Sequence, residues 1–386
     1  MEYDVIVCGG GIAGVSAALA AARNGANTLL IEREYALGGL ATLGLVCVYL
    51  PLCDGRGTKM SSGISEELLK LSLKYGPGKI PDAWTDDSST ADERAKERYM
   101  LTFNPASFVL SAEEELLNNN VKILYGAQIS EVGRKDGKLS SVFIETKTGR
   151  KEIPGKTFVD ATGDADICFF AGEQTVECNN NRRTGWYFSY DDKKIELHQN
   201  ADPLYTDIPT GSRIYSGIDT DDISQSCIDG RAMIKADIMK KRKTNPSIYP
   251  LIIPSFHGLR MTRRLKSEHF FSTDSEGVYF DDTIGMIGNW KTSGERYTIS
   301  LKVIEGVAND NLYAAGRCVS ADEDGQDLTR VIPSCAVTGE AAGTIAAYQS
   351  QHGEKPSAEK LRRILNDNGV LLDRNIFYQK DKTAEN

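Results

Sequence analysis

Three closely spaced glycines near the start of the chain, Gly9, Gly11 and Gly14, have the spacing of a phosphate-binding turn. They stand between an apolar run and an alanine-rich run, a pattern that predicts a strand, a tight turn and a helix. Glycine permits the turn, lets the backbone approach a pyrophosphate and lets the helix pack closely on a sheet, while the helix N-terminus attracts the anion. Glu32 ends the next apolar run, where its carboxylate can accept hydrogen bonds from ribose hydroxyls. The stretch therefore predicts a dinucleotide-binding unit.

A second stretch with the residue types for chemistry is "HGLRMTRRL", residues 257–265. His257 could act as a base, because an unperturbed imidazole titrates at about pH 6.5. Arg260, Arg263 or Arg264 could clamp a carboxylate. On an extended strand Arg260 and Arg264 share one face, whereas a helix places all three arginines together. The alternative is a loop histidine beside arginines that form surface salt bridges. We take His257, Arg260 and Arg264 as the candidate catalytic residues.

The glycine- and alanine-rich stretch from about Pro333 predicts a long helix, because proline favours the first turn. Its small residues are typical of close helix packing. Its N-terminus, at Ile332 to Cys335, can also face a ligand that becomes negative during a reaction. Arg330 precedes the helix and could reach such a ligand, or pair with a nearby aspartate. Cys47 could face a ligand, although a small buried side chain is the simpler interpretation.

The composition limits the class of protein. The chain has 386 residues, 40% of them hydrophobic, which predicts two or three structural units, and its net charge of −9 disfavours a broad nucleic-acid surface. No apolar run approaches the roughly 20 residues of a membrane span, and the first strand begins too early for a cleaved leader, so we expect a cytoplasmic protein. The four histidines and eight cysteines show neither metal-ligand spacing nor a C-x-x-C pair, so we expect no metal and reduced cysteines.

The order of the elements predicts a discontinuous nucleotide-binding domain interrupted by a second domain. The expected boundaries are 1–50, 104–172 and 301–350 for the nucleotide-binding domain, 51–103 and 173–300 for a substrate or cap domain, and 351–386 for a C-terminal helix and tail.

Short β runs at about 121–126, 129–133, 140–147 and 151–153 predict a small meander between the parts of the nucleotide-binding domain. The meander leads into a strand that ends at "ATGD". This strand is expected to bring a further glycine to the ligand-binding edge of the sheet.

Four blocks of the sequence resemble a known family. In order and spacing, "GGGIAG...IERE...GGLAT", "FVDATGDAD", "GLRMTRRL" and "NLYAAGRCVSA...RVIPSCAVTGEAAGTIAA" are similar to the bacterial FAD-dependent oxidoreductases of the glutathione-reductase-like fold, in the group with a GRC-[IV]-SA block. The resemblance spans essentially the whole chain. It implies an α/β fold, with a Rossmann-like FAD-binding domain and an inserted α+β substrate domain, and it implies FAD without specifying a substrate.

The resemblance also assigns positions along the cofactor. It implies pyrophosphate binding at the first glycines, ribose binding at Glu32 and Arg33, and flavin contacts at the later blocks. Many members have Gly-Asp where this chain has Gly316-Arg317, so the ribityl contact must be made differently. The full set of expected cofactor-binding residues is Gly9, Gly11, Ile12, Ala13, Gly14, Glu32, Arg33, Gly38, Gly39, Ala41, Thr42, Ile129, Thr162, Gly163, Asp164, Gly316, Arg317 and Ile332.

These features favour an FAD-dependent dehydrogenase or oxidase that moves a hydride between FAD and a small polar substrate that can carry a carboxylate. The chain shows no second glycine-rich unit for NAD(P)H and no redox disulfide pair, so electrons are expected to come from the substrate directly. An RNA-modifying flavoprotein that acts on tRNA and a non-catalytic FAD-binding protein are the alternatives. The expected partner is a small molecule, without nucleic acid or membrane, and a homo-oligomer stays open.

Overall fold

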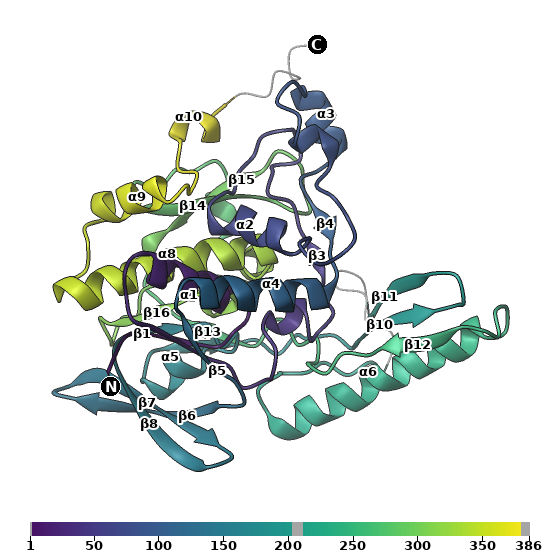
Figure 1. Cartoon of the computed structure of the whole chain (residues 1–386), viewed down its shortest axis with the longest axis horizontal. Helices are drawn as coiled ribbons and strands as arrows, with labels where there is room; N and C mark the ends of the chain where they lie inside the picture. The colour runs from purple at the N-terminus through teal and green to yellow at the C-terminus, as the bar shows by residue number, and fades with distance from the viewer. Residues whose placement is uncertain (1, 203–210, 380–386) are drawn as a thin grey trace.

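A computed structural model describes residues 2–202 and 211–379 of the chain (Figure 1). Within these residues the largest element is a seven-stranded sheet with the order β5-β2-β1-β8-β7-β6, in which β16 also pairs with β8. The strands are β1 (Tyr3–Cys8), β2 (Thr28–Ile31), β5 (Lys122–Leu124), β6 (Gln128–Lys135), β7 (Lys138–Thr146), β8 (Gly149–Asp160) and β16 (Leu312–Ala314).

The parallel part of this sheet brings four strand ends to one edge. Cys8 at the end of β1 lies opposite both Ile31 of β2 and Asp160 of β8, and Asp160 in turn lies opposite Ala314 of β16. Because these strands run in the same direction and end in register, the four segments that follow them leave the sheet side by side. This is the edge at which parallel α/β sheets bind ligands.

The meander differs from the sequence prediction in two respects. The run predicted at about 121–126 is β5, which pairs in parallel with β2 at the edge of the main sheet and takes no part in the meander. The runs predicted from 151 onward form the single strand β8, which pairs antiparallel with β7 at its start and in parallel with β1 at its end. The alternation of apolar and polar residues in the sequence could not show that one strand pairs with both β7 and β1.

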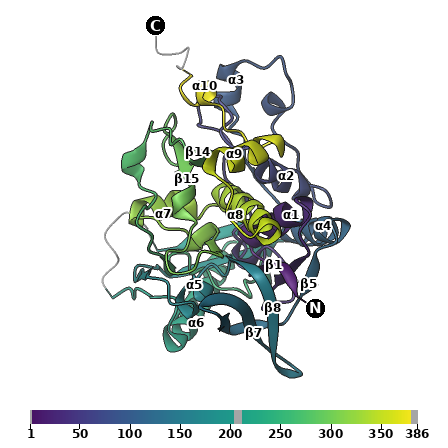
Figure 2. The ribbon, with the colours of Figure 1, turned by 90° about the vertical axis from the view of Figure 1, so that its left-hand side faces the viewer.

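Two helices cover one face of the sheet and contact each other closely. They are α1 (Ile12–Arg23) and α8 (Ile332–His352), which lie side by side near β1 in Figure 2. A Cβ atom at Gly339 would lie 2.3 Å from the carbonyl oxygen of Ala13, and one at Gly343 would lie 2.1 Å from that of Ala17. The two glycines therefore allow the backbones of α1 and α8 to touch.

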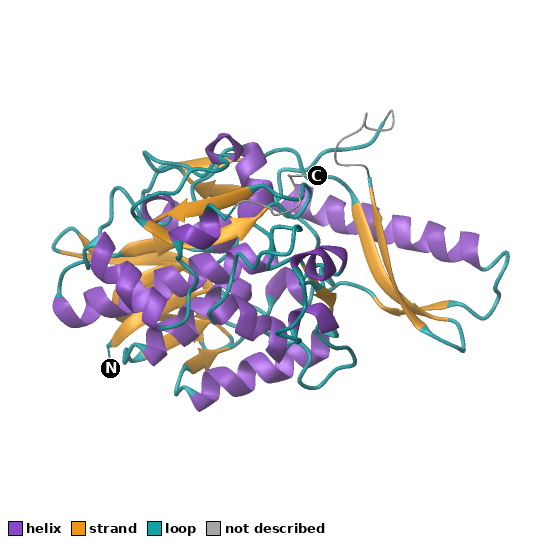
Figure 3. Cartoon of the chain, turned by 90° about the horizontal axis from the view of Figure 1, so that it is seen from above, coloured by secondary structure: helices purple, strands orange, loops and turns teal. Residues whose placement is uncertain are grey.

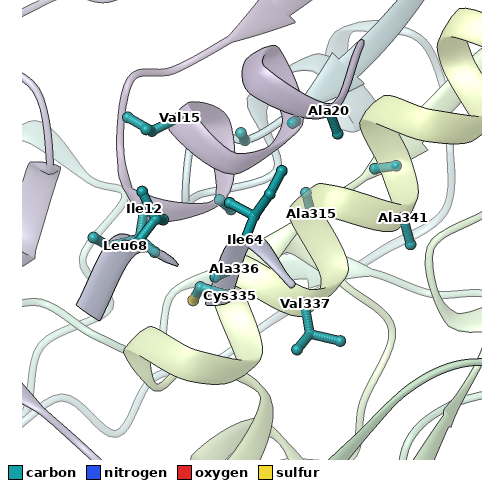
Figure 4. Close-up of a cluster of buried hydrophobic side chains, with 14 of the residues drawn as sticks. Ile12, Val15, Ala20, Ile64, Leu68, Ala315, Cys335, Ala336, Val337 and Ala341 are labelled. Carbon is teal, nitrogen blue, oxygen red and sulfur yellow. The ribbon is translucent and has the colours of Figure 1, made fainter. Parts of the chain in front are cut away.

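A third helix, α2 (Ile64–Leu71), completes this part of the core. Figure 4 shows Ile64 and Leu68 of α2 packing toward α1 and α8, and all the apolar side chains labelled there are buried. Glu340 of α8 is buried in the same layer, and its Oε2 accepts a hydrogen bond of 2.9 Å from the backbone N–H of Ile64. The side chain of Glu340 thus accepts from one of the N–H groups at the start of α2 that have no partner within the helix.

A second sheet projects from this body. Its order is β11-β10-β12, and it lies along the long helix α6 (Thr220–Lys241), as Figures 1 and 3 show. The strands are β10 (Thr184–Tyr190), β11 (Ile195–Ala201) and β12 (Tyr249–Ile252). The chain returns to the body after β12, where the N–H groups of Ser255 and Phe256 both donate to the carbonyl oxygen of Leu43.

The remaining elements are short or peripheral. Three two-stranded sheets pair β3 with β4, β9 with β13 and β14 with β15 within the described residues. Their bounds and those of the remaining helices are β3 (Val48–Tyr49), β4 (Leu101–Thr102), β9 (Thr175–Glu177), β13 (Arg263–Leu265), β14 (Thr283–Gly288), β15 (Arg296–Ser300), α3 (Ala91–Lys96), α4 (Pro105–Asn118), α5 (Asp166–Phe170), α7 (Glu323–Thr329), α9 (Ala358–Asp367) and α10 (Arg374–Phe377).

The domain boundaries predicted from the sequence stay a prediction. The structure does show that residues 51–103 contact segments from both predicted domains, since Ser61 donates to the carbonyl oxygen of Met286 and Ser65 to that of Pro333. The predicted C-terminal helix is α9, and a short α10 follows it. Residues 380–386 of the predicted tail lie outside the described residues. None of the described helices combines the length and apolarity needed to cross a membrane.

The contact between α1 and α8 gives a first prediction. Gly339→Ala should lower the free energy of unfolding by about 1–3 kcal/mol, because its Cβ cannot be placed without moving the helices apart. Gly11→Ala is the matched control, because its backbone has φ −67 and no other atom lies within 4 Å of the new Cβ. Denaturant unfolding of the cofactor-free proteins measures both. Equal destabilisation by the two substitutions would contradict the proposed contact.

The buried carboxylate of α8 gives a second prediction. Burial raises the pKa of Glu340 from 4.5 to about 8. The folded protein therefore keeps a proton that the unfolded chain releases, so stability falls as the pH rises from about 4.5 to about 8.

Glu340→Gln keeps an acceptor for the N–H of Ile64 but does not titrate. It should match the wild type near pH 5 and be more stable near pH 9 by on the order of 2 kcal/mol. Glu359→Gln, at an exposed position of α9, is the control and should show no such dependence. A stability difference for Glu340→Gln that does not change with pH would rule out a buried, protonated carboxyl.

Candidate active site

A cavity of about 350 Å³ opens at the edge where the parallel strands end. The residues that follow four of the strands line it: Gly9 after β1, Glu32 after β2, Ala161 after β8 and Ala315 after β16. The cavity is therefore built from segments that are far apart in the sequence and adjacent only because the strands end in register.

The glycine-rich turn forms one wall of the cavity. Gly9 has φ +104, and a Cβ there would lie 2.4 Å from the carbonyl oxygen of Ala161. A Cβ at Gly14 would lie 1.8 Å from the carbonyl oxygen of Gly9, so this glycine closes the turn onto the helix. At Gly11, by contrast, no atom beyond the chain neighbours lies within 4 Å of an added Cβ. Gly9 and Gly14 are thus required by the turn itself, whereas Gly11 keeps the cavity open.

Glu32 holds this turn from the end of β2. Its Oε2 accepts a hydrogen bond of 2.6 Å from the N–H of Gly10, and its Oε1 accepts one of 2.8 Å from the N–H of Glu34. Burial raises the pKa of Glu32, and the two N–H donors oppose that shift. The carboxylate is therefore fixed at the cavity wall before any ligand binds.

Two helix N-termini border the same cavity. Ile12 and Ala13 of α1 line it, as do Val331 and Ile332 at the start of α8. Within the described residues no side chain caps either helix. Uncapped N–H groups and the positive ends of two helix dipoles therefore face one space, an arrangement that favours anionic groups in the ligand.

The "ATGD" segment after β8 is held by buried polar groups. Asp160, fully buried at the end of β8, accepts hydrogen bonds from the N–H and hydroxyl of Thr162 and from the N–H of Cys168. The Sγ atom of Cys318 accepts from the N–H groups of Gly163 and Ala165. These contacts keep Thr162 and Gly163 at the cavity wall.

Most of the cofactor-binding residues expected from the sequence line this cavity. Those that line it are Gly9, Gly11, Ile12, Ala13, Glu32, Arg33, Gly38, Gly39, Ala41, Ile129, Thr162, Gly163, Gly316, Arg317 and Ile332. Gly14, Thr42 and Asp164 lie behind the wall and hold the backbone that forms it. Thr42 donates to the carbonyl oxygen of Leu37, and Asp164 accepts from the hydroxyl of Thr262 at 2.7 Å.

Arg317 occupies the position at which many similar proteins carry an acid. Its Nη1 donates to the carbonyl oxygen of Leu259 at 2.6 Å, and its Nη2 lies 3.4 Å from Oδ1 of Asp164. A Cβ at Gly163 would lie 2.3 Å from the same Nη2 atom. The absence of a side chain at Gly163 leaves room for this guanidinium, which links the segments after β8 and β16 to the segment before β13.

His257 does not reach the cavity, contrary to the expectation of a base beside the ligand. It lines a separate void of about 10 Å³ between α6 and β10, and its buried Nε2 has no hydrogen-bond partner among the described residues. Burial, with a smaller effect of Arg231, lowers the pKa of His257 to about 4. The imidazole is neutral at physiological pH and packs against Gly230. The geometry gives no support to its predicted catalytic role.

Arg263 and Arg264 alternate on β13, as an extended strand requires, but neither lines the cavity. Arg264 is buried and donates to the carbonyl oxygen of Ala321 and to Sγ of Cys178. Arg263 forms an ion pair of 2.6 Å with Asp166. The expectation of a ligand contact for Arg264 is therefore not supported, because backbone and sulfur acceptors already hold its guanidinium.

Arg260 does line the cavity. Its guanidinium lies 4.7 Å from the centre of the Trp186 ring, and its buried Nε has no hydrogen-bond partner in the described part of the chain. Burial lowers the pKa of Arg260 to about 10, with further effects of Arg330 and Arg317. Of the three candidate catalytic residues, Arg260 alone is brought to the site.

Several lining residues were missed because no spacing links them to the motifs. Trp186 and Gln199 come from β10 and β11, Phe256 from the segment after β12, and Trp290 from the loop between β14 and β15. Asp166, in α5, was also missed, and burial with the nearby Asp164 and Asp160 raises its pKa to about 6. An isolated tryptophan or glutamine outside a motif carries no signal of its own.

The sequence left the roles of two further residues open, and the structure shows where both lie. Arg330 lines the cavity and is paired with Asp327, which also binds Lys291. Cys47 is buried and absent from the cavity wall, which its neighbours Val46 and Val48 help to form. All eight cysteines are free, and in residues 2–202 and 211–379 no group of three or more metal-ligating side chains could hold an ion.

Comparison with known proteins identifies the family. The family model "FAD dependent oxidoreductase" matches residues 4–187 and 179–365, which together span nearly the whole chain. The chain belongs to this family. Its members use FAD, so the predicted cofactor and the predicted class of enzyme are confirmed.

Other similarities are more distant. The tRNA uridine 5-carboxymethylaminomethyl modification enzyme MnmG of Geotalea uraniireducens (strain Rf4) is 32% identical over 176 residues, which are 42% of this chain and only 24% of that protein. The p-nitrophenol 4-monooxygenase PnpA from Pseudomonas putida DLL-E4 has a TM-score of 0.52 at 11% identity, over 98% of this chain and 86% of that one.

A geranylgeranyl bacteriochlorophyll reductase-like protein from Thermoplasma acidophilum has a TM-score of 0.48 at 14% identity, over 99% of this chain and 89% of that one. The likeness to the monooxygenase shows the fold alone. The predicted α/β class, with a Rossmann-like FAD-binding region, is confirmed.

The cavity has the features that an FAD molecule requires. The space beside Gly11, the uncapped start of α1 and the carboxylate of Glu32 all border this cavity, and they are the features that a pyrophosphate next to a ribose requires.

A third prediction follows from Gly11. Gly11→Val should fold, because its side chain has room, but should purify without the flavin absorption because the side chain fills the phosphate position.

Absorption of the purified variant and chromatography of heat-released cofactor measure this. Coincident unfolding curves of the cofactor-free wild type and variant would show that the fold is intact. A normal FAD content in Gly11→Val would refute the placement of the pyrophosphate at this turn.

Proposed function

We propose that this protein is a dehydrogenase or oxidase that transfers a hydride between FAD and a small polar substrate that can carry a carboxylate. The observation that supports the proposal is that one cavity combines two different linings. Around Gly11 and Glu32 the lining is backbone N–H groups and a carboxylate, as a dinucleotide needs. Around Trp186 and Arg260 it is aromatic and cationic, which a dinucleotide does not need.

In this proposal the chain's own residues hold and orient the cofactor. The first turn of α1 and Gly11 bind the pyrophosphate, and Glu32 accepts hydrogen bonds from the adenosine ribose. Arg317 and the start of α8 contact the flavin part, where their positive charge stabilises negative charge that develops on reduction. Bound FAD supplies the hydride acceptor that no side chain can supply.

The other end of the cavity is proposed to orient the substrate. Arg260, Trp186 and Trp290 come from three separate segments and line the same space. The indole N–H of Trp290 donates to the carbonyl oxygen of Asp327 at 3.0 Å, which fixes the ring. Aromatic walls exclude water and leave a guanidinium as the charged contact for a substrate.

The similarity to MnmG keeps a tRNA-modifying flavoprotein as the second candidate, although the match covers about a quarter of that enzyme's length. The chain's net charge of −9 speaks against a phosphate backbone as ligand. A non-catalytic FAD-binding protein is the third. Binding to tRNA in a mobility-shift assay at moderate salt would favour the second over the first.

The cytoplasmic location, the lack of nucleic-acid or membrane partners and the homo-oligomer stay predictions.

The decisive experiment is a substrate panel without oxygen. The purified holoprotein should be yellow, and a small polar substrate should bleach its flavin absorption in proportion to product formed. Readmitting air then separates an oxidase, whose colour returns, from a dehydrogenase, whose colour needs another acceptor. If no polar organic substrate bleaches the flavin while tRNA binds, the proposed function fails.

A fourth prediction compares two candidate catalytic residues. Arg260→Ala should keep its FAD and its fold but lose about 30- to 1000-fold in kcat/KM for the substrate so identified, since a charge-assisted contact of about 2–4 kcal/mol is lost. His257→Gln should stay within about threefold of the wild type, because its ring lies in a separate void. The reverse order of the two effects would contradict the site as described.

A further inference from the structure

The four described arginines that line the cavity differ in how they are paired. Arg330 pairs with Asp327, Arg317 lies against Asp164, and Arg33 lies 3.9 Å from Glu34. Arg260 makes no ion pair with any described residue, and its side chain contacts the face of the Trp186 ring instead. Among the described arginines of the cavity wall, Arg260 is therefore the one without an ion-pair partner.

Two buried hydrogen-bond donors at this point lack acceptors. They are Nε of Arg260 and Nε1 of Trp186, neither of which has a partner among the described residues. Guanidinium and indole groups can only donate, so the two side chains cannot satisfy each other. Burying an unpaired guanidinium Nε–H and an unpaired indole N–H is costly, and a ligand that brings acceptor oxygens removes the cost.

The charges around Arg260 also favour an anionic ligand. The guanidinium groups of Arg330 and Arg317 are close enough to repel that of Arg260, and the carboxylate of Asp327 only partly offsets them. An additional cation or a neutral ligand would leave this repulsion in place. An anion bound against Arg260 would relieve it.

We propose that the substrate is an organic acid whose carboxylate accepts hydrogen bonds from Arg260 and from the indole N–H of Trp186, and whose apolar body lies against the aromatic wall that includes Trp290. This inference rests on the proposed function, because it names the substrate class for the same cavity. A carboxylate matches the two donors because it has two oxygens and one negative charge. Trp290 and Val331 provide the apolar surface for the rest of the molecule.

The test is a binding titration that does not depend on turnover. Holoprotein is titrated with benzoate and, in parallel, with benzamide, which has the same ring but no charge. Binding is followed by the change in flavin absorption and by tryptophan fluorescence. Benzoate should bind at least about 10-fold more tightly than benzamide. Equal affinities for the two compounds would overturn the inference.

Substitutions at Arg260 and Trp186 test where the carboxylate binds. Arg260→Met should abolish the preference for benzoate over benzamide, and Arg260→Lys should keep part of it, because the charge remains while the forked donor is lost. Trp186→Phe keeps an aromatic ring beneath the guanidinium but has no N–H donor, so it should weaken benzoate more than benzamide. Arg213→Met, whose exposed side chain pairs with Asp222 outside the cavity, is the control and should bind both compounds like the wild type.

The outcomes separate this inference from the proposed function. If Arg260→Met keeps the full preference for benzoate, the anion binds elsewhere and the inference fails, while reduction of the flavin by a substrate can still establish the oxidoreductase. If no organic substrate reduces the flavin but benzoate binding depends on Arg260, the proposed function fails and the anion site stands.

Discussion

The contact between α1 and α8 sets the position of the two helix N-termini that border the cavity. Gly339 and Gly343 let the α8 backbone touch the carbonyl oxygens of Ala13 and Ala17, so the starts of both helices come to the same edge of the sheet. Gly316, in the segment after β16, fits into the corner they form, because a Cβ there would lie 2.8 Å from that of Ala13 and 3.3 Å from Sγ of Cys335. With any larger residue at these glycines the two N-termini would separate and would no longer face one ligand.

The part of the site that could be predicted from the sequence lies in short motifs: the first glycine turn with Glu32, the "ATGD" segment and the block at Gly316-Arg317. A strand, a glycine turn and a helix are encoded within one short stretch. Glu32 follows the next strand, and it lies near the turn because that strand pairs with the first. Gly14 is needed by a contact within the turn, whereas Gly9 is needed by its positive φ and by its contact with Ala161, which follows β8. The spacing of the glycines could therefore be recognised in the sequence, but the contact with Ala161 could not.

The opposite end of the cavity could not be predicted for the same reason. His257, Arg260 and Arg264 stand within eight positions of one another in the sequence, yet the chain turns so that they enter a small void, the cavity and a buried network respectively. Their separate environments depend on α6, on the Trp186 ring and on Cys178, none of which is marked by spacing. Likewise, the long strand β8 joins two kinds of pairing that alternation alone does not distinguish.

The position of the projecting sheet bears on how mutations can change this enzyme. Trp186 and Gln199 stand on β10 and β11, and Phe256 follows β12, so the sheet that extends away from the body delivers side chains to the cavity. The glycine turn and Glu32 belong to the other sheet and share no hydrogen-bonded strand with it. Under the proposed function, mutations in the projecting sheet can alter the choice of substrate and leave the glycine turn and Glu32 in place, so the chemistry and the choice of substrate can evolve separately.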